Sequence, residues 1–137
     1  MPDNILYKIA TKQIPAEIVF ENTDAVSVLD VHPIAPGHTL VLPTSMAQNI
    51  LDLEDGAVAG VFRAVKATTA LLQKALRPDG FTIGINHGRV SGQSVDHLHI
   101  HIIPRFSGDG GSSIHTVVHN QPAEDVHTIA ERIRAAA

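Results

Sequence analysis

The sequence VDHLHIHIIPR, residues 95–105, alternates histidine with an aliphatic residue from His97 to Ile102. Successive side chains of a β-strand point to opposite faces, so this alternation predicts a strand over residues 97–104. The three histidines would share one face and the three aliphatic residues the other. We expect the aliphatic face to lie in the core beneath a helix, and the histidine face to remain open.

The segments around this strand predict the other elements. Short apolar runs bounded by turn-forming residues predict strands over residues 17–21, 26–30, 38–43 and 81–86. Helices are predicted over residues 54–76 and 123–136. This order of strands, helix, strands and helix predicts an α+β fold, with a mainly antiparallel sheet of about five strands, one long helix and a C-terminal helix.

The long helix is predicted from apolar residues that recur at three- and four-residue steps. Asp52 is the expected N-cap, and the RPDG sequence at residues 77–80 would end the helix. The expected buried stripe comprises Val58, Val61, Phe62, Val65, Thr69, Leu72 and Leu76.

Composition narrows the class of protein. The chain has 137 residues, so one domain spanning residues 1–137 is expected. A formal net charge of −4 argues against a nucleic-acid partner. The absence of cysteine excludes disulfides and thiolate metal sites. No secretory leader or run of apolar residues long enough to span a membrane is evident, so we expect a cytoplasmic protein without a membrane partner.

The histidine row itself predicts chemistry. Three neighbouring imidazoles cannot all be protonated cheaply, because like charges lower one another's pKa. At least one ring should therefore be neutral near pH 7, and a neutral imidazole is a nucleophile or a base. A protonated neighbour would attract phosphate. His97, His99 and His101 are thus candidate catalytic residues for phosphoryl or nucleotidyl transfer.

Two other interpretations of the row remain open. The histidines could form the solvated face of a half-buried strand. They could also bind a metal ion, because His-x-His on a strand offers two ligands. The Cα atoms of His97 and His101 would lie about 13 Å apart, so a third ligand from elsewhere is required, such as His38 or Asp96.

The loop before the strand offers groups suited to phosphate. Small residues and polar side chains gather there, and backbone N–H groups near glycine can hold phosphate oxygens. The alternative is an ordinary glycine-containing hairpin. The candidate substrate-binding residues in this loop are Asn86, Gly92, Gln93 and Ser94.

Residues 92–103, GQSVDHLHIHII, resemble the signature of the histidine-triad (HIT) superfamily. Residues 33–43, PIAPGHTLVLP, are similar to the branch of histidine-triad nucleotide-binding proteins and bacterial hydrolases. Residues 103–105 and 108–109 are also similar to the dinucleoside polyphosphate hydrolases of the fragile-histidine-triad branch. The resemblance covers most of the chain and implies a HIT-like fold, with about residues 107–137 as a variable C-terminal extension.

The resemblance implies a role for individual residues. His99 would attack the α-phosphorus of a purine nucleotide to form a nucleotidyl-histidine, which water then hydrolyses to the nucleoside monophosphate. His97, His101 and His38 would flank the phosphate, with Asn86, Gly92, Gln93 and Ser94 as further contacts. Asp30 would hold the ribose hydroxyls, and Val31 would lie beside the base. The remaining histidines are expected at the surface: His32, His87, His115, His119 and His127.

The implied substrates are nucleoside phosphoramidates or dinucleoside polyphosphates, and a homodimer is implied as well. The alternative function is a nucleotide-binding regulatory module with vestigial catalysis.

Many bacterial relatives bind a structural zinc through an N-terminal Cys-x-x-Cys, which aligns with residues 4–7 here, and through a histidine near residues 44–46. Neither is present in this sequence. We therefore expect no metal and no cofactor.

Overall fold

The computed structural model describes residues 4–137. Two 3₁₀ turns, Arg89–Ser91 and Ile114–Thr116, lie outside the sheet. The helices and strands, in chain order, are α1 (Ile5–Ala10), β1 (Ile18–Glu21), β2 (Ala25–Leu29), β3 (Thr39–Pro43), α2 (Asp55–Leu76), β4 (Gly80–Gly84), β5 (Ile100–Arg105) and α3 (Val126–Ala135).

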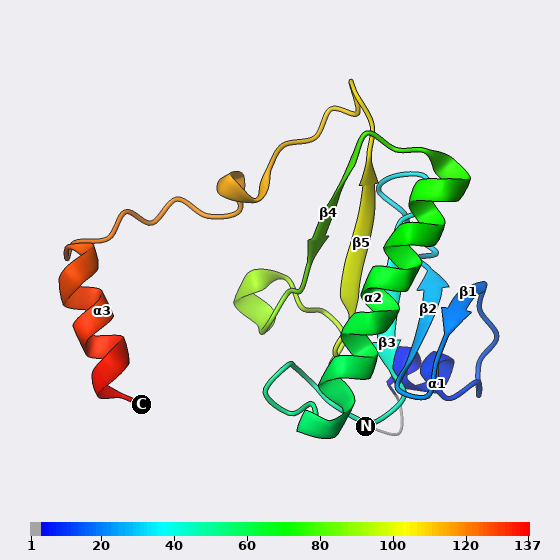
Figure 1. The fold of residues 1–137 in the computed structure, drawn as a ribbon, viewed down its shortest axis with the longest axis horizontal. Coiled ribbons are helices and arrows are strands. Elements are labelled where there is room, and N and C mark those ends of the chain that lie inside the picture. The colour runs from blue at the N-terminus through cyan, green and yellow to red at the C-terminus, as the bar shows by residue number, and fades with distance from the viewer. Residues whose placement is uncertain (1–3) are drawn as a thin grey trace.

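The strands form one five-stranded sheet in the order β1-β2-β3-β5-β4, and every neighbouring pair is antiparallel (Figure 1). The predicted α+β fold is confirmed. β5 lies inside the sheet, where His101 is aligned with Leu40 of β3 and with Gly84 of β4. The histidine-bearing strand is therefore held by neighbours on both sides.

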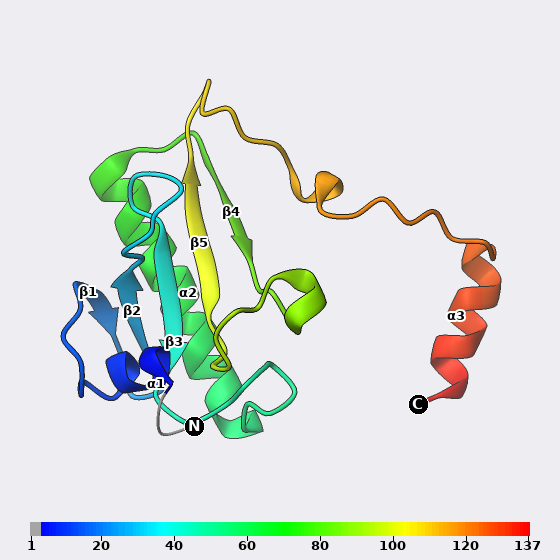
Figure 2. The same ribbon diagram turned by 180° about the vertical axis from the view of Figure 1, so that it is seen from behind.

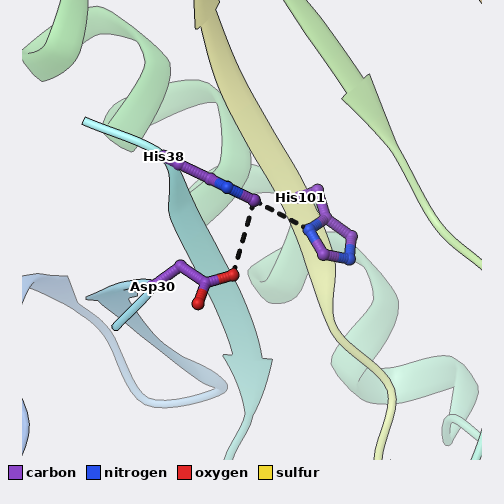
Figure 3. Close-up of side chains that lie close together, drawn as sticks. All are labelled: Asp30, His38 and His101. Atoms are coloured by element: carbon purple, nitrogen blue, oxygen red, sulfur yellow. Dashed lines mark hydrogen bonds and ion pairs between the residues drawn. The ribbon is translucent and has the colours of Figure 1, made fainter. Parts of the chain in front are cut away.

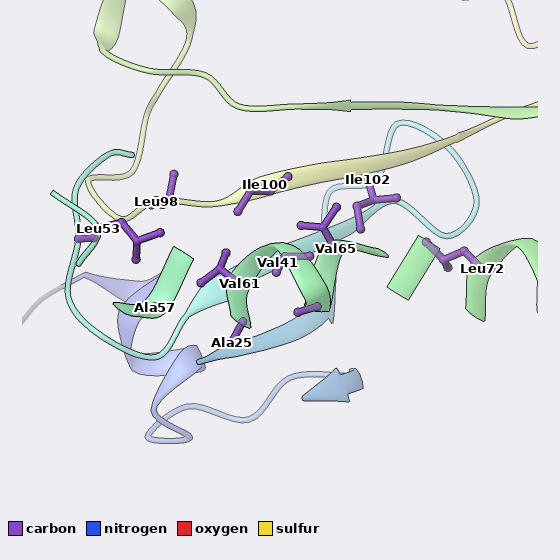
Figure 4. Packing of buried hydrophobic residues seen from close by; sticks show 12 residues of the cluster. Ala25, Val41, Leu53, Ala57, Val61, Val65, Leu72, Leu98, Ile100 and Ile102 are labelled. Atoms are coloured by element: carbon purple, nitrogen blue, oxygen red, sulfur yellow. The ribbon is translucent and has the colours of Figure 1, made fainter. Parts of the chain in front are cut away.

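The helix α2 covers one face of the sheet (Figures 1 and 4). Leu98, Ile100 and Ile102 point into this core, as the alternation predicts, and each is almost fully buried. The helix meets the sheet through small as well as branched residues: Ala57, Gly60, Val61, Ala64, Val65, Thr68 and Leu72. The predicted stripe is therefore wrong for Val58, Phe62 and Leu76, which are 37–41% exposed. Thr69 is only partly buried, and Thr68 is the buried threonine of this helix.

The opposite face of the sheet is partly covered by α1, a helix that the sequence patterns do not predict. Leu6 and Ala10 of this helix pack in a second cluster with residues of β2 and β3. Asn4 caps the helix, because its side-chain oxygen accepts hydrogen bonds from the backbone N–H groups of Leu6 and Tyr7 at 3.0 and 3.2 Å. A helix of six residues is too short to show a hydrophobic period.

Several predicted boundaries are wrong, including the end of β4, which lies at Gly84 rather than at residue 86. β5 begins at Ile100 rather than His97, because the Leu98 N–H donates to the carbonyl of Ala47 at 2.7 Å instead of joining the sheet. The N-cap of α2 is Glu54 rather than Asp52. The carboxylate of Asp52 instead accepts from the N–H of Gln48 in the preceding loop, at 3.2 Å.

The C-terminal arm (residues 107–137) leaves the end of β5 and extends away from the sheet (Figures 1 and 2). Its helix α3 was expected over residues 123–136 and spans Val126–Ala135, with no buried residue. None of the helices within residues 4–137 is both long and apolar enough to cross a membrane.

Gly60 allows α2 to approach the turn between β1 and β2. A Cβ atom on this glycine would lie 1.8–2.8 Å from the side chain of Asp24, and Asn22 Nδ2 donates to the Gly60 carbonyl at 2.9 Å. We predict that Gly60→Ala lowers the free energy of unfolding by about 1–3 kcal/mol, despite the better helix propensity of alanine.

Gly56 provides the matched control in urea denaturation, because a Cβ atom there has no neighbour within 4 Å. Gly56→Ala should leave the stability unchanged or raise it by up to about 1 kcal/mol. Equal effects of the two substitutions would contradict the close approach at Gly60.

Candidate active site

The imidazole of His99 is held in one tautomer. Its Nδ1 lies 2.7 Å from the carbonyl oxygen of His97, which can only accept, so Nδ1 carries the proton. The other nitrogen, Nε2, then has a free lone pair when the ring is neutral. The residue is only 9% exposed, so the ring is well ordered by its surroundings. A neutral, oriented imidazole with a free Nε2 has the form of a nucleophile or a general base.

Asp30, His38 and His101 converge from three neighbouring segments of the chain (Figure 3). Asp30 follows β2, His38 precedes β3, and His101 lies within β5. His38 Nε2 lies 2.9 Å from His101 Nδ1 and 3.6 Å from Asp30 Oδ2. The ring centroids of His99 and His101 are 5.0 Å apart. The antiparallel register therefore brings together residues that are distant in the sequence.

The hydrogen bonds indicate where the protons lie. The N–H of Ile34 donates to Nδ1 of His38 at 3.3 Å, so that nitrogen is unprotonated and Nε2 carries the proton. His38 Nε2 then donates to Nδ1 of His101, which leaves the proton of a neutral His101 on its Nε2. Beside the free lone pair of His99 there is thus a ring with a donor N–H.

Both of these rings are neutral near pH 7. Burial, together with the neighbouring His99 and His38, lowers the pKa of His101 to about 4, against an opposing effect of Asp30. Burial also lowers the pKa of His38, again opposed by Asp30. Neutral rings are consistent with the tautomers that the hydrogen bonds require.

The same three residues form a candidate metal cluster among residues 4–137, with one ligand atom each within 4.8 Å of one another. A metal ion would need the lone pair of His38 Nε2, whereas the hydrogen bond from Ile34 places a proton there. Asp96, the other expected third ligand, forms an ion pair with Arg89 at 3.0 Å. The geometry favours a chain of hydrogen bonds over a metal centre.

The expectation that all three rings lie on an open face is wrong for His97. This residue is 0% exposed, because α1 covers it, and its ring lies edge-on to that of Tyr7 with 5.6 Å between centroids. Its Nε2 donates to the carbonyl of Pro43 at 2.9 Å, while its buried Nδ1 has no hydrogen-bond partner among the described residues. Burial is the main cause of its lowered pKa. The contact of His97 with His99 is the hydrogen bond that its backbone carbonyl accepts from Nδ1 of His99.

The zinc that the resemblance associates with this corner does not fit the residues present. Asn4 uses its side-chain oxygen to cap α1, and Tyr7 offers a ring face to His97. Neither side chain is a usual zinc ligand, and His97 alone does not make a site. Side-chain packing and helix capping hold this corner together.

The loop between β4 and β5 is fastened by Gln93. This buried side chain donates to the carbonyls of Gln48 and Val95, at 2.7 and 3.1 Å, and accepts from the N–H of Gly88 at 2.9 Å. Both the oxygen and the nitrogen of its amide therefore form hydrogen bonds to backbone groups, and these bonds hold the loop in place. Gly92 has a φ of +105°, which favours glycine.

The other expected binding residues are accessible. Asn86 and Ser94 are exposed in this loop. The β4–β5 register pairs Gly84 with His101, and Asn86 and His99 lie just beyond the paired ends of these two strands. Val31, expected beside the base, is 82% exposed next to Asp30.

The contributions of Tyr7 and of the Ile34 N–H were not expected from the sequence. The prolines and the glycine of residues 33–38, PIAPGH, restrict the backbone, but only the folded loop shows that its backbone sets the tautomer of His38.

Comparisons with known proteins agree with this geometry. The model of the HIT domain matches residues 11–108. A HIT-like protein of unknown function from Methanocaldococcus jannaschii is 42% identical over 106 residues, covering 77% of this chain and 81% of that protein. The adenosine 5′-monophosphoramidase hnt1 of Schizosaccharomyces pombe is 31% identical over 129 residues, covering 94% of each chain.

A crystal structure of a HIT family protein from Bacillus anthracis superposes with a TM-score of 0.85 at 28% identity. The superposition covers 98% of this chain and 97% of the other, so it includes most of the C-terminal arm.

The lowered pKa of His101 predicts a pH-dependent stability. An unfolded histidine takes up a proton near pH 6.5, whereas folded His101 does so near pH 4. Between these values the unfolded state binds more protons, so the free energy of unfolding falls as the pH falls. His101→Asn should therefore show a weaker pH dependence than the wild type in urea denaturation from pH about 7 to about 5.

The exposed His115 is the matched control, and His115→Asn should follow the wild-type pH dependence. Identical slopes for all three proteins would mean that His101 is no harder to protonate in the folded state than in the unfolded state.

Proposed function

Since this chain belongs to the HIT (histidine triad) family, we propose that it hydrolyses nucleotides at the α-phosphate through a nucleotidyl intermediate on His99. Its substrate would be a purine nucleoside monophosphate attached to a leaving group through a phosphoramidate or a phosphoanhydride bond. The observation that carries the proposal is the orientation of His99, whose Nδ1 is bound to the His97 carbonyl at 2.7 Å.

The first step transfers the nucleotidyl group to His99. The lone pair of Nε2 forms a bond to the α-phosphorus, and the bond from phosphorus to the leaving nitrogen or oxygen breaks with its electron pair on the leaving atom. In the second step a water oxygen attacks the same phosphorus, and Nε2 regains its electron pair. The products are the nucleoside monophosphate and the protonated leaving group.

The leaving amine takes its proton from solvent, because His101 is neutral and a neutral imidazole is too weak an acid to lose its N–H. The Nε2–H of His101 instead donates a hydrogen bond to the leaving atom or to a phosphate oxygen, and the attacking water of the second step returns a proton to solvent. His38 donates to Nδ1 of His101 at 2.9 Å and so keeps that ring in the donating tautomer. No net proton is gained or lost by the protein over the cycle.

Binding would use groups on both sides of the histidines. The Asp30 carboxylate, at the end of β2, is available to the ribose hydroxyls, with Val31 beside the base. The exposed side chains of Asn86 and Ser94, with the backbone N–H groups near Gly92, would contact the phosphate oxygens. His97 acts through its carbonyl and as a packing residue.

The relatives support an enzymatic role. The Schizosaccharomyces pombe protein bears the name adenosine 5′-monophosphoramidase, and it aligns with 94% of this chain. The alternative is a module that binds nucleotide without turning it over, and a single kinetic comparison separates the two.

We predict that the wild type releases AMP from adenosine 5′-phosphoramidate with EDTA present, and that His99→Asn slows this release by a factor on the order of 10³ or more. Asparagine keeps a polar side chain of similar reach but offers no nucleophilic nitrogen. His115→Asn, in the exposed arm, should retain wild-type activity. AMP release would be followed by chromatography.

Two outcomes would contradict the proposal. Binding of AMP by the wild type without any turnover would favour the regulatory module. Loss of turnover on chelation, restored by added Zn²⁺, would favour a metal centre at Asp30, His38 and His101.

A further inference from the structure

His99 lies just before the first residue of β5, on a segment that strand pairing does not hold. Two hydrogen bonds tie this segment to the chain at and after the end of β3. The N–H of Leu98 donates to the carbonyl of Ala47 at 2.7 Å. The side chain of His97 donates through Nε2 to the carbonyl of Pro43 at 2.9 Å. The position of His99 therefore depends on these bonds and on the packing around them.

The side chain of His97 forms a directional bond at only one of its two nitrogens. Its Nδ1 is buried and has no hydrogen-bond partner among residues 4–137. A single hydrogen bond fixes a distance but leaves the ring free to turn about the bond. The backbone carbonyl of the same residue accepts the proton of His99 Nδ1 at 2.7 Å. A change in the position of His97 would therefore also displace the group that orients His99.

Packing against Tyr7 of α1 supplies the second restraint on this ring. The two ring centroids are 5.6 Å apart and the ring planes meet at 62°, an edge-to-face arrangement that aromatic rings favour. Tyr7 is itself held on both sides of its backbone. Its N–H donates to the side-chain oxygen of Asn4 at 3.2 Å, and its carbonyl accepts from the hydroxyl of Thr11 at 2.9 Å.

His97 acts on His99 by position and not by proton transfer. The ring is fully buried, so it does not reach a substrate. A second proton would place an N–H group at Nδ1, where the described residues offer no acceptor. Burial accordingly lowers the pKa of His97, and the ring is neutral near pH 7.

Asn4 and Tyr7 stand at the two positions where the resemblance places zinc-binding cysteines. Neither is a usual zinc ligand, but both act on the same corner of the molecule. Asn4 caps α1, and Tyr7 packs on His97. Hydrogen bonding and packing by these two residues thus fix the N-terminal segment against the segment that carries His99.

We propose that Tyr7 is a positioning residue for the nucleophile: its ring fixes His97, and the carbonyl of His97 then fixes the orientation and tautomer of His99. This inference rests on the proposed function, because it assigns Tyr7 a role in the reaction of His99. The flat ring is the required feature, so phenylalanine should replace tyrosine and an aliphatic residue should not.

The kinetic test follows AMP release from adenosine 5′-phosphoramidate by Tyr7→Leu, Tyr7→Met and Tyr7→Phe. A misplacement on the order of 1 Å can slow a reaction about 10²-fold. We expect the leucine and methionine variants to lower kcat by about tenfold with KM within about twofold of wild type, because His99 touches the reacting phosphorus. Tyr7→Phe should retain wild-type kcat. Two aliphatic variants are used so that one folded protein suffices.

The spectroscopic test observes His99 directly, by ¹⁵N NMR of the histidine rings. The wild type should show His99 with its proton on Nδ1. In Tyr7→Leu and Tyr7→Met the two ring nitrogens should shift toward the values of a mixture of tautomers, whereas Tyr7→Phe should match the wild type. This measurement needs no substrate.

Gly60→Ala is the control for lost stability, because the close contact it creates is with Asp24 and not with this corner. It should keep the wild-type kcat and the wild-type ¹⁵N shifts of His99. Urea denaturation would confirm that each variant is folded under the assay conditions.

The outcomes separate the inference from the function on which it rests. Wild-type kcat in the folded aliphatic variants, a rise in KM alone, or an equal loss in Gly60→Ala would overturn the inference. A loss of kcat with unchanged ¹⁵N shifts of His99 would overturn it as well. If the wild type releases no AMP, the proposed function fails, and the ¹⁵N shifts of His99 in the aliphatic variants still support or overturn the positioning role of Tyr7.

Discussion

The central position of β5 in the sheet is the constraint on which the rest of the structure depends. This strand pairs with β3 on one side and β4 on the other, so its twist and register are set by two neighbours. Its alternation sends Ile100 and Ile102 into the core against α2 and keeps His101 on the other face. A shift of one residue would bury the histidine and expose the aliphatic residues. The energy of core packing thereby fixes the position of a candidate catalytic ring.

Backbone carbonyl and N–H groups then set the chemistry of the rings. His99 donates to the carbonyl of His97, and His38 accepts from the N–H of Ile34. These two bonds select opposite tautomers, one with a free Nε2 and one with a protonated Nε2. Because His38 Nε2 donates to Nδ1 of His101, the proton of a neutral His101 also lies on its Nε2. Backbone groups are rigid, so the preference does not depend on a flexible side chain.

The sequence predicts those features that follow from a local period. Residues 97–102 show the alternation, and residues 54–76 show the period of the long helix, which together indicate the α+β fold. The burial of His97 could not be predicted, because it depends on Tyr7, ninety residues earlier, in a helix too short to show a period. The convergence of Asp30, His38 and His101 depends on strand order, which becomes evident only in the folded sheet. The role of the Ile34 N–H is also invisible in the sequence, since every residue except proline has such a group.

The central claim is that His99 carries the nucleotidyl group, and its direct test is to trap that species. Wild-type protein would be mixed with adenosine 5′-phosphoramidate, quenched in base within one turnover, and digested for mass spectrometry. The account predicts AMP bound covalently to the peptide that contains His99, and none in His99→Asn treated in the same way. AMP on another residue, or rapid turnover with no covalent species at any time before steady state, would contradict it.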